Sequence, residues 1–301
     1  MAKKAPYKYF EPEQAARLGK LNLIARTAVE GFVTGLHRSP HHGFSVEFSE
    51  HREYVSGDDL RHLDWVALAR TDRYYIKRYE QETNLRAHIL LDVSGSMGYG
   101  SGGMTKFEYG CRLASLIAYL MVRQQDVVGL VTFDKAIRSH LPPGSTATHL
   151  DRLFTSLEEL TPGDVTAVSR TFHDLAEKIA RRGLIIIISD LYDDPLDVMR
   201  ALRHFRHNKH QVIVFHVFDP AELDLPFNKL VTFVDMETQE KLQIDPKFIR
   251  DEYKRQIDGF VARYRRDCSD SAIEYIVTST ATPYDVTLRS YLASRQRIGR
   301  R

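Results

Sequence analysis

The sequence predicts an α/β protein built on an open, mostly parallel sheet that is flanked by helices. Three observations predict this class: short apolar runs recur from residue 87 onward, helical patterns separate them, and each run is continuously hydrophobic. Continuous hydrophobicity indicates strands that are buried on both faces, as in a parallel sheet covered by helices. The alternation of such strands with helices favours a single open α/β domain.

The first part of the chain has a different texture. Residues 11–34 predict an amphipathic helix, because apolar residues recur at helical spacing up to Gly35. Residues 36–84 hold two short strand-like pieces, FSVEF and RYYIKRY, around the turn VSGDD. We therefore expect a helix and short-strand region over 1–84, followed by the α/β domain over 85–301.

The predicted domain contains five buried strands and five helices in alternation. The strands are AHILLD (87–92), VVGLVTFD (127–134), LIIIISD (184–190), VIVFHVFD (212–219) and AIEYIVTS (272–279). The helical patterns cover 106–122, 147–160, 168–182, 193–207 and 246–267. AIRSHL (136–141) fits a short antiparallel edge strand, and LVTFVDMETQEKLQI (230–244) fits a hairpin inserted into this plan.

Composition narrows the class of protein. The 42 basic residues nearly cancel the 40 acidic ones, so the net charge of +2 does not favour general nucleic-acid binding. Cys111 and Cys268 form no CxxC motif and no disulfide framework, which favours a reducing compartment. The longest apolar runs are far shorter than the roughly 20 residues that span a bilayer, and no secretory signal is visible. We expect a cytoplasmic protein without membrane insertion.

Four of the apolar runs end in an aspartate: Asp92, Asp134, Asp190 and Asp219. In an open α/β sheet, ligands bind outside the carboxyl ends of the strands. Asp92 and Asp190 lie on that edge if their strands are neighbours. For Asp134 and Asp219, the favoured interpretation is a residue that orders the turn or caps the next helix.

The stretch DVSGSM, residues 92–97, predicts a metal site. Asp92, Ser94 and Ser96 are spaced by two, so their side chains point the same way if the chain stays extended. Carboxylate and hydroxyl oxygens suit Mg²⁺, with Mn²⁺ or Ca²⁺ as alternatives, but three side chains do not complete six positions. Asp190 is the best-placed second carboxylate, and Thr166 in TPGDVTAV is the best-placed further hydroxyl. A helix N-cap is an equally good interpretation of Thr166.

Two enzymatic interpretations compete with the metal site. Ser96 lies in S-G-S-M-G, which lacks the first glycine of the hydrolase motif G-x-S-x-G. GYGSGGMT (98–105) resembles a phosphate-binding loop, but Met104 stands where the lysine belongs and Lys106 comes two residues late. We keep a nucleotide hydrolase or a magnesium-dependent phosphohydrolase as the alternative class.

The motif DVSGSM resembles the D-x-S-x-S motif of von Willebrand factor A domains. This resemblance implies a metal-ion-dependent adhesion site, in which a threonine on a second loop and an aspartate on a third complete the motif. Thr166 and Asp190 stand in the corresponding order. The family usually has Gly-Gly-Thr-Asp in the second loop, whereas this chain has GDVTA.

The segment before the sheet carries a second resemblance. The pattern E-F-x-E-x-R-x-Y-x-x-G-D-D-x-R-x-x-D-W, from Glu47 to Trp65, resembles a bacterial family of unknown function that joins this region to a von Willebrand A-like domain. KFEYGCRLASLIAYLMVRQQDVVGLVTFD, which begins at Lys106, fits the same family. Such proteins are commonly linked to MoxR-type AAA+ ATPases. The set of oxygen ligands has no accompanying base or nucleophile, so we expect a non-enzymatic module that binds an acidic side chain of a partner. The resemblance implies that this partner is such an ATPase or its client protein.

Overall fold

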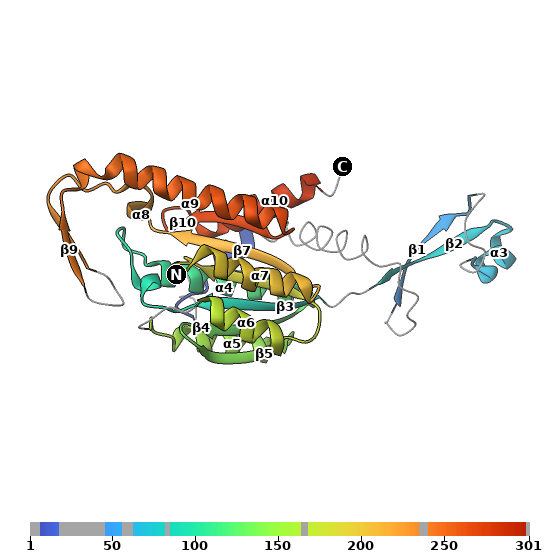
Figure 1. The fold of residues 1–301 in the computed structure, drawn as a ribbon. Coiled ribbons are helices and arrows are strands. Elements are labelled where there is room, and N and C mark those ends of the chain that lie inside the picture. Colours follow the sequence, from blue (N-terminus) through green and yellow to red (C-terminus); the bar gives the residue numbers. More distant parts are fainter. Residues whose placement is uncertain are drawn as a thin grey trace. The chain divides into compact units, whose positions relative to one another are not determined.

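The computed structural model describes residues 7–17, 46–55, 63–81, 85–163, 168–234 and 240–298. The chain divides into two compact units, Phe32–Asn84 and the remainder, which comprises Met1–Gly31 and Leu85–Arg301. One end of the smaller unit thus coincides with the expected boundary after residue 84. Figure 1 labels the helices and strands of both units.

The smaller unit contains a two-stranded sheet and a short helix. Strand β1 (Val46–Glu53) pairs antiparallel with β2 (Tyr75–Gln81). Helix α3 (Trp65–Thr71) lies between them in the sequence. The buried Asp64 accepts a hydrogen bond from the backbone nitrogen of Ala67 (3.0 Å), which satisfies one donor at the start of this helix.

The larger unit is built on a six-stranded sheet. Its strands lie in the order β10-β7-β6-β3-β4-β5, and only β5 runs antiparallel to its neighbour. The strands are β3 (Arg86–Asp92), β4 (Val127–Phe133), β5 (Ile137–Gly144), β6 (Leu184–Ser189), β7 (Gln211–Phe218) and β10 (Glu274–Ser279). The predicted fold class and the antiparallel edge strand are confirmed, and all five predicted strands are present. Four of them are buried, whereas β10 lies at the other edge of the sheet and is mostly half-buried.

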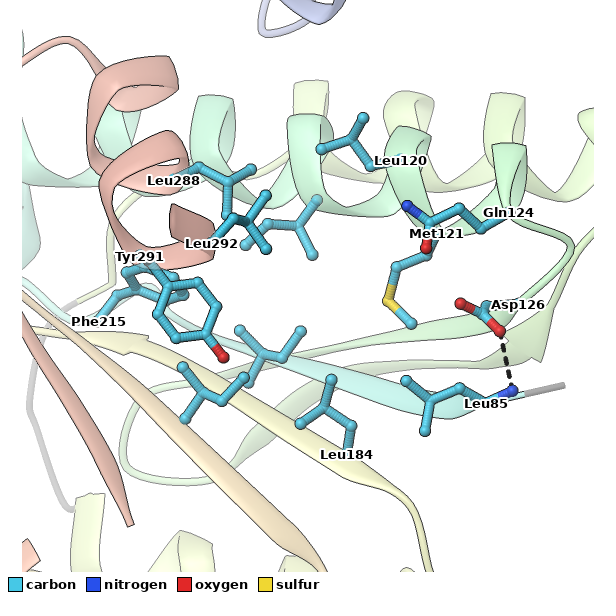
Figure 2. Close-up of a pocket in the computed structure, with 13 residues that line it drawn as sticks. Leu85, Leu120, Met121, Gln124, Asp126, Leu184, Phe215, Leu288, Tyr291 and Leu292 are labelled. Carbon is cyan, nitrogen blue, oxygen red and sulfur yellow. Dashed lines mark hydrogen bonds between the residues drawn. The ribbon is translucent and has the colours of Figure 1, made fainter. Parts of the chain in front are cut away.

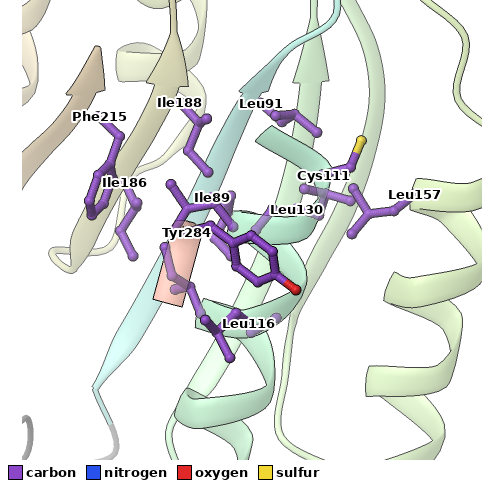
Figure 3. Packing of buried hydrophobic residues seen from close by; sticks show 14 of the residues in the cluster. Ile89, Leu91, Cys111, Leu116, Leu130, Leu157, Ile186, Ile188, Phe215 and Tyr284 are labelled. Carbon is purple, nitrogen blue, oxygen red and sulfur yellow. The ribbon is translucent and has the colours of Figure 1, made fainter. Parts of the chain in front are cut away.

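Helices cover both faces of this sheet. One face packs against α1 (Pro12–Arg17), α4 (Lys106–Arg123), α5 (Ala147–Glu158) and α10 (Tyr284–Ile298), and the other against α6 (Val168–Lys178), α7 (Pro195–His207) and α9 (Arg250–Asp270). Side chains alternate between the two cores: Ile89 and Leu91 belong to the first, and Leu90 to the second. Figure 3 shows part of the first core, where α4 and Tyr284 pack on the sheet. This double coverage explains why the strand sequences are continuously apolar.

Residues 7–17 belong to the larger unit and pack against its helices. Phe10 stacks on Phe154, with ring centroids 4.8 Å apart, and Tyr9 meets Phe107 edge-on. Residues 7–17 therefore contribute to the first core, together with the helices that flank it. The predicted helix over 11–34 is present as α1 from Pro12 to Arg17, and its remaining residues lie outside the described part of the chain.

Three smaller elements complete the larger unit: the one-turn helix η3 (Ser96–Gly98), α8 (Pro220–Asp224) and η4 (Pro246–Phe248). The predicted hairpin is also confirmed. Strand β8 (Val231–Val234) pairs antiparallel with β9 (Lys241–Ile244), and together they form a separate two-stranded sheet.

A small apolar cavity lies at the amino ends of the strands. It has a volume of about 80 Å³, and α4, α10, β6 and β7 line it together with Leu85, which directly precedes β3, as Figure 2 shows. The backbone nitrogen of Leu85 donates to Asp126 Oδ1 (2.9 Å) at its rim. The cavity therefore lies at the sheet edge opposite Asp92.

Among the described residues, no helix is long and apolar enough to cross a membrane.

His88 makes the stability of the fold depend on pH. Its side chain is buried on β3, Nδ1 lacks a hydrogen-bond partner, and burial lowers its pKa to about 4. The unfolded chain takes up this proton near pH 6.5 and the folded chain only near pH 4, so stability is lost as the pH falls through this window. We expect His88→Gln to reduce the pH slope of the unfolding free energy there by up to about 1.4 kcal/mol per pH unit.

Urea denaturation at several pH values between 4 and 7 measures this slope. The same substitution at the exposed His207 on α7 is the control. An unchanged slope in His88→Gln, or an equal loss of slope in the control, would contradict the assignment to His88.

Candidate metal centre at the carboxyl edge of the sheet

The sheet brings the two predicted carboxylates to one edge. Strands β3 and β6 are parallel neighbours, with Leu91 opposite Ile188, so Asp92 and Asp190 follow adjacent strand ends. Asp92, Ser94 and Asp190 are fully buried, and Ser96 is half-buried. The condition that made these residues candidates, neighbouring strands, is therefore met.

The Asp92 carboxylate holds the loop of DVSGSM in place. Its Oδ1 accepts a hydrogen bond from the backbone nitrogen of Ser94 (2.9 Å), and its Oδ2 accepts from the Ser189 hydroxyl (2.6 Å). The hydroxyl oxygens of Ser94 and Ser96 lie 3.1 Å apart. The three residues of the motif thus converge as predicted. Ser189 was not predicted as part of the site, although it directly precedes Asp190 in LIIIISD.

The backbone after Asp190 has an unusual conformation. Leu191 has a φ of 51°, in the left-handed region, although its side chain is fully buried. This conformation costs a non-glycine residue about 1–2 kcal/mol. The Leu191 nitrogen donates to the Ser189 hydroxyl (2.9 Å), which fixes the turn. Such backbone strain clusters at functional sites. Here the left-handed conformation of Leu191 turns the chain immediately after the Asp190 carboxylate.

His216 supports the same turn from strand β7. Its Nε2 donates to the backbone oxygen of Asp190 (2.7 Å), which can only accept, so Nδ1 accepts from the Tyr275 hydroxyl (2.6 Å). Burial lowers the pKa of His216 to about 4, so the ring is neutral at physiological pH. Both ring nitrogens are engaged, and the histidine acts as a fixed support for Asp190.

Lys106 is the cation of the site. Its fully buried Nζ lies 2.7 Å from Asp190 Oδ2 and 2.5 Å from Glu222 Oε1. Burial alone lowers the pKa of Lys106, but the two carboxylates outweigh this effect and raise the pKa, so the ammonium stays charged. The sequence drew attention to Lys106 only as a displaced phosphate-loop lysine. Neither its role beside Asp190 nor that of Glu222 was predicted.

The site contains more negative than positive charge. Asp92, Asp190 and Glu222 are three carboxylates, and Lys106 is the single cation that the described residues place in contact with them. Burial, and then repulsion by Asp190, raises the pKa of Asp92 to about 7. Burial also raises the pKa of Glu222. The site therefore favours whatever supplies further positive charge, either protons or a cation.

The donor set fits a hard divalent cation. Two neighbouring oxygens of an octahedral Mg²⁺ shell, each about 2.1 Å from the ion, lie about 3.0 Å apart. The separation of the Ser94 and Ser96 hydroxyls matches this spacing. Among the described residues, no three His, Cys, Asp or Glu side chains group as metal ligands. Thr166, the predicted third hydroxyl, lies outside the described residues. Gly163, three positions before it, donates to the backbone oxygen of Val93 (2.5 Å).

The glycine-containing loop over 98–105 is held by a carboxylate of the protein itself. The backbone nitrogen of Ser101 donates to Asp219 Oδ2 (2.9 Å), and the Ser101 hydroxyl donates to Oδ1. A phosphate loop instead offers its backbone N–H groups, with a lysine, to the ligand. Here Asp219 takes the place of an anionic ligand, and Lys106 is committed to ion pairs. Both features weigh against the phosphate-loop interpretation.

The other two strand-end aspartates have the predicted structural roles. Asp219 caps α8, because its Oδ1 accepts from the backbone nitrogen of Ala221 (2.9 Å). Asp134 orders its turn by accepting from Ala136 N (3.1 Å), and its carboxylate pairs with Arg138 (2.5 Å). Asp219 does more than was predicted, since it also binds Ser101 and the Thr280 hydroxyl.

The described residues form an α/β protein with a six-stranded, mostly parallel open sheet that is flanked by helices, and a smaller unit comes before most of it in the sequence. Residues 50–259, more than two thirds of the chain, match the model of the family described as protein of unknown function DUF58. The chain belongs to this family, so the predicted bacterial family of unknown function is confirmed. Uncharacterized proteins of Mycobacterium tuberculosis and Mycobacterium bovis are 25% identical over 292 residues, which are 95% of this chain and 91% of theirs.

Two solved structures from Bacteroides are also similar. The conserved hypothetical protein BatB of Bacteroides thetaiotaomicron aligns with a TM-score of 0.48 and 17% identity, over 70% of this chain and 98% of that chain. An aerotolerance-related membrane protein of Bacteroides fragilis aligns with a TM-score of 0.47 and 18% identity, over 70% and 99% of the two chains.

The buried ion pairs of Lys106 lead to a prediction about stability. We expect Lys106→Met to lower the unfolding free energy by about 3–5 kcal/mol, because it leaves two buried carboxylates without their cation. The exposed pair Arg200–Asp197 provides the control, and Arg200→Met is expected to cost less than about 1 kcal/mol. Chemical denaturation measures both. Adding Glu222→Gln to Lys106→Met removes one unpaired carboxylate and is expected to restore part of the loss. Equal losses in Lys106→Met and Arg200→Met would contradict the assignment.

Proposed function

We propose that this protein is a metal-dependent protein-binding module that uses Mg²⁺, with Mn²⁺ or Ca²⁺ as alternatives. Ser94, Ser96 and Thr166 offer hydroxyl oxygens, and Asp92 and Asp190 hold the waters of the ion. One observation carries the proposal: two hydroxyls lie at the spacing of neighbouring metal ligands, beside a buried carboxylate whose charge is not compensated.

The residues of the centre favour an acidic ligand. A bound Mg²⁺ supplies an open coordination position and keeps a net positive charge, because its direct protein ligands are neutral hydroxyls. Asp190 is already paired with Lys106 through Oδ2, so its negative charge is shared. A carboxylate from a partner is therefore the group that complements the centre, which makes recognition selective for an acidic side chain.

The surroundings of the two serines support binding rather than catalysis. A nucleophilic serine needs a base within hydrogen-bonding distance. Among the described residues, the nitrogen groups next to the site are already engaged, since His216 uses both ring nitrogens and Lys106 is a charged donor to two carboxylates. The phosphohydrolase and nucleotide-hydrolase alternatives gain no support from these contacts. We therefore propose a non-enzymatic role.

The resemblance of the N-terminal segment suggests the partner. Within this proposal, the acidic side chain belongs to a MoxR-type AAA+ ATPase, or to a client protein that such an ATPase remodels. The protein then acts as an adaptor in the cytoplasm and binds neither nucleic acid nor membrane. The free thiols of Cys111 and Cys268 are both buried and agree with a reducing compartment.

Metal binding is testable without a partner. We expect Mg²⁺ to stabilise the protein, by about 2.7 kcal/mol at a concentration one hundred times the Kd, because it binds only the folded state. Asp92→Asn and the double variant Ser94→Ala/Ser96→Ala are expected to lose this effect. Thermal denaturation with Mg²⁺ and with EDTA measures it. Asp134→Asn, a carboxylate at the end of the neighbouring strand β4, is the matched control and is expected to retain it. A stabilisation that persists in Asp92→Asn would disprove the site.

The partner requires a separate experiment. We expect a purified MoxR-type ATPase from the same organism to be retained by the immobilised protein in Mg²⁺ and released in EDTA. Asp92→Asn is expected to abolish retention, whereas Asp134→Asn is expected to preserve it. If the wild-type protein binds Mg²⁺ but fails to retain the ATPase, the partner assignment is wrong and the metal-binding proposal stands.

A further inference from the structure

A cavity of about 600 Å³ opens directly beside the candidate metal centre. Ser96 lines this cavity, and so does Tyr192, which lies two residues after Asp190. The remaining walls come from Tyr99, from α8 with its Glu222 carboxylate, from the segment that follows α8, from the hairpin and from the start of α9. They are mostly apolar or aromatic and include Tyr99, Phe227, Phe233, Leu242, Ile249 and Tyr253. The cavity and the metal centre thus share a boundary at Ser96.

The hairpin that forms one wall exposes apolar side chains. None of the residues in β8 and β9 is buried, and an isolated two-stranded sheet has little stability of its own. Leu242 is 59% exposed inside the cavity wall. Leu230, Val234 and Phe248, outside the cavity lining, are also exposed, Phe248 to 88%. Grouped exposed apolar residues of this kind mark interaction sites.

The base of the hairpin is held firmly, so the wall is preformed. Arg250 at the start of α9 donates from Nε to the backbone oxygen of Leu225 (3.1 Å) and from Nη2 to that of Phe227 (2.6 Å). Tyr253 donates its hydroxyl proton to the backbone oxygen of Glu222 (2.8 Å). Glu222 belongs to α8, and its side chain pairs with Lys106. The Lys106 ammonium also lies 4.8 Å from the ring centre of Tyr192. One set of contacts therefore positions both the cavity wall and the metal centre.

We propose that this cavity binds an aromatic or large aliphatic side chain of the same partner segment whose carboxylate reaches the metal. This inference rests on the proposed function and specifies the chemistry of the partner: an acidic residue and a large apolar residue close together in one peptide segment. The cation beside Ser96 complements the acidic residue, and the adjoining cavity complements the apolar one.

Two features favour a protein segment over a small molecule. Leu242 in the cavity wall is 59% exposed, and Leu230, Val234 and Phe248 outside the lining are exposed as well, which is apolar surface that a ligand confined to the cavity leaves uncovered. In addition, single carboxylates are common on protein surfaces, so a metal centre alone discriminates poorly among partners. A second contact with an apolar side chain supplies the difference in affinity that specificity requires.

A peptide library tests the inference. It has one fixed central glutamate and random flanking residues, and it is selected on the full-length protein in Mg²⁺ and in EDTA. We expect selection in Mg²⁺ of peptides with a large apolar residue at a constant spacing from the glutamate. Leu242→Glu is expected to weaken the best peptide by at least about tenfold, because it removes the apolar wall for a side chain that is buried on binding. Leu242 is exposed, so the fold is expected to be unaffected, which thermal denaturation checks.

The controls separate this inference from the proposed function. Val286→Lys, which changes an exposed apolar residue outside the cavity lining, is expected to alter binding less than about twofold. Selection in Mg²⁺ on the glutamate alone, unaffected by Leu242→Glu, would overturn the inference and leave the proposed function intact. Failure to select any peptide in Mg²⁺, or equal selection of apolar peptides in EDTA, would overturn both.

Discussion

The structure depends on one buried lysine that pairs with the buried Asp190 and the partly exposed Glu222, beside a third carboxylate, Asp92. Taking charged groups out of water is costly unless each has a partner, so Asp190, Glu222 and Lys106 must stay in contact. This requirement connects elements that are far apart in the sequence: the start of α4, the end of β6 and the short helix α8. No cation among the described residues contacts Asp92, and burial beside Asp190 raises its pKa to about 7. The arrangement of these four side chains follows from the excess of carboxylates over cations at the site.

The surrounding contacts fix the carboxylates in position at some cost in stability. Leu191 adopts a left-handed conformation, and the buried ring of His216 is held neutral between Asp190 and Tyr275. A fold selected for stability alone has no need of such features, because apolar side chains of similar volume fill a sheet edge more cheaply. Their concentration at one edge agrees with a site maintained for binding.

The sequence predicted the fold well because the fold is determined by burial. Continuous apolar runs identified the four central strands and the edge strand β10, and the more polar stretches identified the antiparallel edge strand β5 and the hairpin. Asp92, Ser94 and Ser96 were predictable from the motif, although the backbone there is not extended as expected, because Gly95 is helical and Ser96 begins the one-turn helix η3. Glu222 and Ser189 were not, since their roles depend on which strands and helices become neighbours. In the sequence, Lys106 was considered only as a possible phosphate-binding lysine, because it follows a glycine-containing loop at the start of a helix. In the structure, its ammonium instead contacts the carboxylates of Asp190 and Glu222.

The hydrogen bonds of Asp219 restrict how three segments of the larger unit can move. One carboxylate accepts hydrogen bonds from the loop over 98–105, from the first turn of α8 and from Thr280 in the turn after β10. These three segments are therefore joined at a single point and cannot shift independently. Because α8 also carries Glu222, a displacement of the glycine-containing loop is transmitted to the partner of Lys106, and from there to Asp190. The position of the glycine-containing loop is therefore coupled, through Asp219 and α8, to the ion pairs of Lys106.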